Sequence, residues 1–167
     1  VVKADGHEGG VSLGYDAIET NVLDTVTVPE GYTAHTIAAW GDPINGKSPR
    51  FEKDASNPAA HQEEQLGQGH DGMYYYPLGP NRDSNTRGLL AINHEYTLGQ
   101  LTFPDGRENW DAPKTRKEQA GHGISVVEIE RKRNGEWKVV PSFRARRITP
   151  RTKIAITGPA AGHRLMR

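Results

Sequence analysis

The chain has 167 residues, and its 21 basic and 21 acidic side chains cancel, which argues against disorder caused by a large net charge. Leu, Ile, Val and Phe together number only 31, which a fragment with hydrophobic partners elsewhere in its parent protein would explain. The lack of cysteine excludes a disulfide framework, and no apolar stretch approaches the roughly 18 residues that a membrane span requires.

The predicted elements are short and mostly extended. Residues 1–27 begin Gly-rich without a sustained period and are interpreted as an irregular arm that precedes one unit, 28–167. The stretch 41–69 is polar and contains three prolines, and it predicts a long loop. Runs of β-forming residues predict strands at 32–40, 73–78, 88–93, 123–131, 137–140, 143–148 and 153–157.

Two local signals predict a hairpin and a helix. Asn134 and Gly135 form a turn signal between β-forming runs, which predicts that 124–131 pairs with 137–140. A helix is predicted across Lys114–Ala120, with Asp111 as its N-cap and Pro113 in the first turn. Short strands, long loops and at most one short helix favour an all-β sandwich or propeller.

The basic residues are concentrated near the C-terminal end. Residues 131–167 carry 11 basic side chains and a single acid, Glu136. Such a segment suits phosphate, nucleic acid or an acidic surface of the same protein, and we favour the last. Only Trp137 and Phe143 are aromatic within it, so aromatic and basic residues do not interleave as in a nucleic-acid binder. We therefore predict no nucleic-acid partner.

The sequence Asn93-His94-Glu95 is the most suggestive candidate site. It directly follows the apolar run 89–92, so three polar side chains stand at the end of a predicted strand. Glu95 and Asn93 would present a carboxylate and a carbonyl oxygen to a hard cation from one side, while His94 points to the other face. The alternative, favoured by the spacing alone, is that all three bond to the following loop.

Other candidates have a simpler structural reading. Asp71 lies between His70 and Gly72, where a turn residue is favoured over an oxygen ligand. His122 and His163 follow glycines, and for both a hydrogen-bonding role is favoured over a ligand. No phosphate-binding loop, nucleophile elbow or paired-histidine zinc motif occurs. Catalytic residues therefore stay unassigned.

Several phrases in order carry a resemblance to a known family. They are VPEGYTAHTIAAWGDPI (28–44), DGMYYYPL (71–78), GLLAINHEYT (88–97), HGISVVEIER (122–131), WKVV (137–140), RRIT (146–149) and TGPAAGHRL (157–165). This series resembles the N-terminal third of PhoX-type alkaline phosphatases. The resemblance implies a β-propeller that hydrolyses phosphate esters with calcium and iron, in a periplasmic or extracellular location reached by the twin-arginine route.

The resemblance also assigns roles to the candidate residues. It makes Glu95 the first choice as a metal ligand, with Asn93 second, Asp71 weaker and His163 weakest. The iron-binding cysteine that the family places after the Gly158–His163 phrase is absent from these 167 residues. We therefore expect an N-terminal part of a larger catalytic domain, inactive alone, whose partners are a phosphate ester and the remainder of its polypeptide. The alternative is a non-catalytic, calcium-stabilised propeller module for binding or support.

Overall fold

The computed structural model describes residues 14–166, which divide between a unit that ends at Thr36 and a unit that begins at Ile37. Within the first unit, the described residues form neither helix nor strand, and Tyr15 packs edge-on against Tyr32 at 5.6 Å. The predicted strand at 32–40 is therefore wrong, because its β-forming residues find no neighbouring strand to pair with. The predicted strand at 153–157 is wrong as well.

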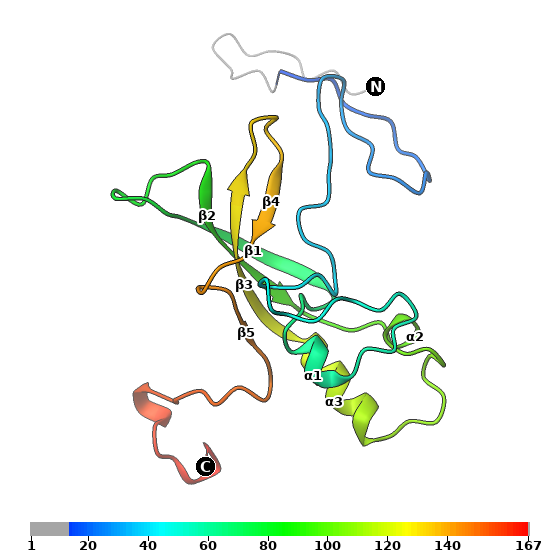
Figure 1. Cartoon of the computed structure of the whole chain (residues 1–167), viewed down its shortest axis with the longest axis vertical. Coiled ribbons are helices and arrows are strands. Elements are labelled where there is room, and N and C mark those ends of the chain that lie inside the picture. Colours follow the sequence, from blue (N-terminus) through cyan, green and yellow to red (C-terminus); the bar gives the residue numbers. More distant parts are fainter. Residues whose placement is uncertain (1–13, 167) are drawn as a thin grey trace. The chain divides into compact units, whose positions relative to one another are not determined.

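An antiparallel sheet dominates the second unit (Figure 1). Its first four strands lie in sequence order, and the fifth also pairs with β3, on the edge that β4 occupies further along. Because the unit is mostly antiparallel sheet with few helical residues, the all-β class is confirmed. The sheet is not closed, and the propeller stays a prediction. The strands are β1 (His70–Pro77), β2 (Arg87–His94), β3 (Gly123–Arg131), β4 (Trp137–Val140) and β5 (Arg146–Ile148).

The strand predictions succeed best where pairing is local. The hairpin of β3 and β4 is confirmed, with Arg131 opposite Trp137 and Gly135 at a φ of +90° in the turn. That φ suits glycine, which has no Cβ to clash with the backbone. The strand predicted at 143–148 is confirmed only over β5, because Phe143 and Arg144 form a turn instead.

The stretch 41–69 is not a plain loop, and this prediction needs correction. Its two ends are joined by backbone hydrogen bonds from Gly41 N–H to Leu66 O and from Leu66 N–H to Asp42 O, at 3.0 and 2.9 Å. This pairing turns apolar side chains onto one face of the sheet. The resulting core is formed by Ile44, Leu66, Ile92, Val127 and Ile129.

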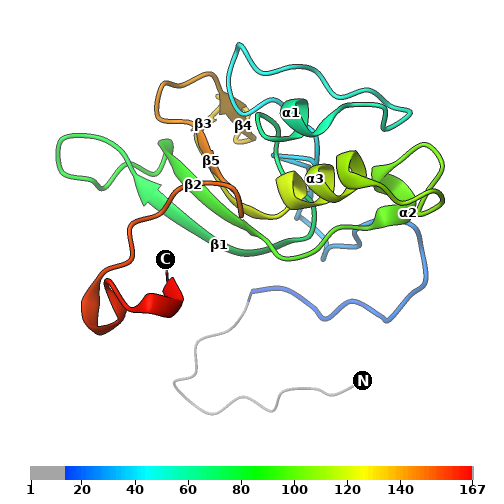
Figure 2. The same ribbon diagram turned by 90° about the horizontal axis from the view of Figure 1, so that it is seen from below.

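The chain contains more helix than predicted. The expected helix is present as α3 (Ala112–Gly121), but α1 (Ala59–Gln62) and α2 (Gly99–Thr102) add one turn each. The expectation of at most one short helix is therefore wrong, because one-turn helices depend on tertiary contacts rather than on a periodic pattern. Figure 2 shows α1 beside α3, against which it packs. Two short 3-10 turns follow at Gly158–Ala160 and Arg164–Met166.

No helix among residues 14–166 combines the length and apolarity that crossing a membrane would require.

Asp111 caps α3 as predicted, since its Oδ1 accepts a hydrogen bond from Lys114 N–H at 2.8 Å. We expect Asp111→Ala to lower the free energy of unfolding by about 1 kcal/mol, because a helix N–H loses its acceptor. Urea unfolding measures the difference. Asp83→Ala, at an exposed loop position, is the matched control and should change stability by less than about 0.5 kcal/mol. Equal effects of the two substitutions would contradict the capping role.

Candidate functional site

At the end of β2, successive polar side chains point to opposite faces of the sheet, as they do along any strand. His94 is buried, with 2% of its surface exposed, whereas Asn93 and Glu95 are exposed. Asn93 shares its face of the sheet with Ile124, its partner in β3. The expectation that His94 points away from Asn93 is confirmed.

Asp71, in β1, lies at the same end of the sheet as Asn93. His70 pairs with His94 and Met73 pairs with Ile92, so the register shifts by one residue between them. Asp71 and Gly72 consequently face Asn93 across the irregularity. Asp71 is exposed, like Asn93.

The donor set at this strand end consists of oxygen atoms. Within residues 14–166, the Glu95 carboxylate makes no ion pair with Lys or Arg. Carboxylate and amide oxygens fit calcium, whereas iron with a thiolate finds no ligand here. The same described residues contain no cluster of three His, Asp or Glu side chains able to hold an ion. They therefore fit part of a calcium site and not a complete one.

Directly behind these residues, His94 lies in a buried hydrogen-bond network. Its Nδ1 lies 3.1 Å from Gln68 O, and because a carbonyl only accepts, Nδ1 carries the proton. Nε2 then accepts, from the Ser125 hydroxyl at 2.6 Å and from Gly67 N–H at 3.3 Å. Ser125 Oγ in turn accepts from Arg147 Nη1 at 3.1 Å. The assignment leaves His94 neutral.

The electrostatics agree with a neutral ring. Burial first, and the nearby charge of Arg147 second, lower the pKa of His94 to about 3. Burial also lowers the pKa of Arg147 to about 10, so its guanidinium stays charged at neutral pH. Arg147 Nη2 donates to Ala120 O and His122 O, at 2.6 and 2.8 Å, which joins the end of α3 to the network.

Gln68 connects the network to the segment after Glu95. Its Oε1 accepts from Leu98 N–H at 2.6 Å, and its Nε2 donates to Thr102 Oγ1 at 2.9 Å. Gly69 O accepts from Glu95 N–H at 2.9 Å. Residues 67–69 therefore hold the backbone on both sides of Glu95.

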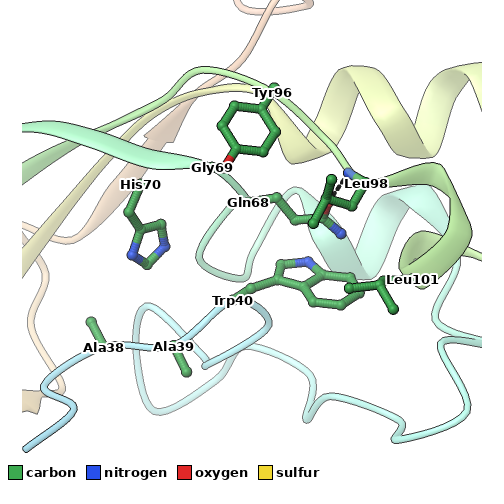
Figure 3. A pocket seen from close by; sticks show the side chains of 9 residues that line it. All are labelled: Ala38, Ala39, Trp40, Gln68, Gly69, His70, Tyr96, Leu98 and Leu101. Atoms are coloured by element: carbon green, nitrogen blue, oxygen red, sulfur yellow. Dashed lines mark hydrogen bonds between the residues drawn. The ribbon is translucent and has the colours of Figure 1, made fainter. Parts of the chain in front are cut away.

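A pocket of about 240 Å³ adjoins this corner (Figure 3). His70 lines it, and the His70 ring lies 4.9 Å from the His94 ring, so the pocket is on the His94 side of the sheet. Asn93 points to the other side, which separates the pocket from the candidate ligands. The Trp40 indole in its wall donates to Gln62 Oε1 at 2.7 Å, a structural role.

The remaining histidine candidates make local hydrogen bonds. His163 Nδ1 accepts from Leu165 N–H at 3.3 Å within its own turn. His122 Nδ1 lies 2.7 Å from Glu118 O, one turn earlier in the chain. His122 is thus a hydrogen-bonding residue, as favoured, and the ligand role of His163 stays a prediction.

The comparisons identify the family. The family described as alkaline phosphatase PhoX matches residues 13–167. This chain belongs to the PhoX alkaline phosphatase family. The predicted resemblance is therefore confirmed. Among solved structures, Pseudomonas fluorescens PhoX in complex with vanadate, a transition state analogue, is similar, with a TM-score of 0.85 and 39% sequence identity.

The similarity covers 92% of this chain and 26% of the Pseudomonas fluorescens PhoX chain. The chain thus spans about a quarter of that PhoX structure's length. A search of curated proteins gave no match.

Sequence reasoning missed Gln68, Ser125 and Arg147 in this PhoX-family chain. Each is a common residue without a motif, and its partner lies more than 20 residues away in the chain.

Proposed function

We propose that this chain forms part of the active site of an exported, metal-dependent phosphatase that hydrolyses phosphate esters. Membership of the PhoX family supports the reaction class, and the similarity to a vanadate complex supports a phosphoryl-transfer site. Glu95 carries the proposal at the level of residues, because its carboxylate is exposed at the end of β2 and makes no ion pair with any residue that the structure describes. A periplasmic or extracellular location is part of the same proposal.

In this proposal Glu95, Asn93 and Asp71 give oxygen ligands to calcium. Calcium takes 6 to 8 oxygen ligands, so these residues supply a part of the set and the remainder of the polypeptide supplies the rest. Iron would bind outside these 167 residues, which contain no cysteine. When bound, the cations neutralise negative charge on the ester oxygens. Asn93 and Glu95 bind and orient the calcium ion, while the buried His94 stays neutral behind them.

Exposed aromatic residues on one face of the sheet support a larger domain. Tyr74 and Tyr76 in β1 are 65% and 53% exposed, with ring centroids 4.8 Å apart. Their strand partners are Ala91 and Leu89, so they share the face that carries Asn93. An apolar sheet face beside the candidate ligands suits further strands of a propeller. We propose that the 167-residue chain alone is therefore inactive.

The proposed role of Glu95 is tested in the intact phosphatase. We expect Glu95→Ala to lower turnover of p-nitrophenyl phosphate and bound calcium together, each at least tenfold, because a charged calcium ligand is lost. Turnover and metal analysis of the purified variant measure both. Glu52→Ala is the matched control, because Glu52 is exposed and forms no ion pair within the described part of the chain.

Unchanged turnover and calcium in Glu95→Ala would remove Glu95 from the site. The non-catalytic alternative predicts calcium binding with no hydrolysis by the intact protein. The isolated chain, assayed with added calcium and iron, should show no turnover. Turnover comparable to that of the intact protein would contradict the proposed division of the site.

A further inference from the structure

We infer that His94, Ser125 and Arg147 act together as positioning residues that hold Glu95 in place for its cation. This inference rests on the proposed function and extends it to residues that cannot contact the substrate, because they lie behind the strand end. The structure supports it in three steps.

Among residues 14–166, the Glu95 side chain has no ion-pair partner, so its position before an ion arrives depends on its backbone. Glu95 N–H donates to Gly69 O at 2.9 Å. The next constraint along the chain is the bond from Leu98 N–H to Gln68 Oε1 at 2.6 Å. The preceding residue is His94, whose ring bonds Gly67 N–H and Gln68 O. Every one of these bonds joins the 94–98 segment to residues 67–69.

The His94 ring is the central constraint because it bonds both Gly67 and Gln68. Ser125 fixes the ring orientation, since its hydroxyl donates to Nε2 at 2.6 Å. That hydroxyl has one proton, and the donor on its other side, Arg147 Nη1, leaves His94 as its acceptor. Ser125 is fully buried, so water does not substitute for it.

Arg147 anchors the network to a rigid element. Its Nη2 bonds the carbonyls of Ala120 and His122, at the end of α3. The support thus runs from α3 through Arg147, Ser125 and His94 to the residue before Glu95. Such buried supports commonly change metal affinity 10- to 100-fold when removed, because a ligand must be held in place before the ion binds.

The test compares two serine substitutions in the intact phosphatase. Ser125→Ala breaks the support, whereas Ser142→Ala removes a hydroxyl that donates to Glu128 at 2.6 Å and has no contact with the network. In metal-stripped protein we expect Ser125→Ala to weaken calcium binding about tenfold or more, and Ser142→Ala less than about twofold. Calorimetric titration measures both affinities.

Two further readouts separate positioning from general stability. In metal-free Ser125→Ala, the amide protons of Glu95 and Leu98 should exchange faster than in the parent and in Ser142→Ala. Excess calcium should restore turnover of Ser125→Ala, with an unchanged KM for the ester. His94→Gln keeps an acceptor near the Nε2 position, so it should bind calcium more tightly than His94→Leu.

The outcomes are distinguishable. If Glu95→Ala loses calcium but Ser125→Ala matches Ser142→Ala in affinity and exchange, the positioning role is overturned while the proposed function stands. If Glu95→Ala keeps its calcium, the proposed function fails and this inference fails with it. Should Ser125→Ala not fold, the His94 pair decides, and equal affinities of His94→Gln and His94→Leu would overturn the inference.

Discussion

Acidification from pH 6.5 towards pH 3 is expected to lower the free energy of unfolding by about 1.4 kcal/mol per pH unit through His94 alone. Burial holds the pKa of His94 at about 3 in the fold, whereas an unfolded histidine titrates near 6.5. Between these values the unfolded chain binds the extra proton, so stability falls as pH falls. The contribution is complete above pH 6.5 and amounts to about 4 to 5 kcal/mol when lost.

Urea unfolding at intervals of half a pH unit measures this dependence. His94→Gln removes the titrating group, so the slope between pH 6.5 and 4.5 should largely disappear. His163→Gln, at an exposed histidine, should keep the slope of the parent. A hydrogen bond from Lys114 lowers the pKa of Asp105. Protonation of Asp105 therefore changes the free energy of unfolding only below about pH 4, outside the range from pH 6.5 to 4.5. Identical slopes in the two variants would contradict a neutral, buried His94.

Gly67→Ala is expected to cost about 3 kcal/mol or more of unfolding free energy. A Cβ at this position would lie 2.3 Å from Gly121 O and 2.5 Å from His94 Cγ. The first atom belongs to the backbone and the second to a ring held by hydrogen bonds, so displacing either atom would cost considerable free energy. The added methyl group would therefore separate the 67–69 segment from β2 and release Glu95.

Gly72→Ala is the matched control, because its Cβ would meet nothing within 4 Å and its φ is not positive. Gly72→Ala should leave stability unchanged or raise it by up to about 1 kcal/mol, since alanine restricts the unfolded chain. Urea unfolding at pH 7.5 measures both variants. Similar stability of the two would show that the corner around Gly67 can expand, contrary to the close contacts described.

Much of the sheet was predictable from local patterns. β2 and β3 are runs of apolar residues, and Asn134-Gly135 sets the turn of the hairpin, because both depend on residues close in sequence. The cap of α3 by Asp111 follows the same rule. The candidate ligands Asn93 and Glu95 were found because a polar cluster directly after an apolar run indicates a strand end.

The sequence by itself determined the all-β class, all five strands with the fifth predicted too long, the family resemblance and the strand end at Glu95. Only the tertiary structure decided that 32–40 is unpaired, that 41–69 covers the sheet, and that Ser125 and Arg147 support His94. A strand requires a partner, and a buried polar side chain requires acceptors and donors from distant segments. Neither requirement leaves a mark within a short window of sequence, because the partners meet only after the chain has folded.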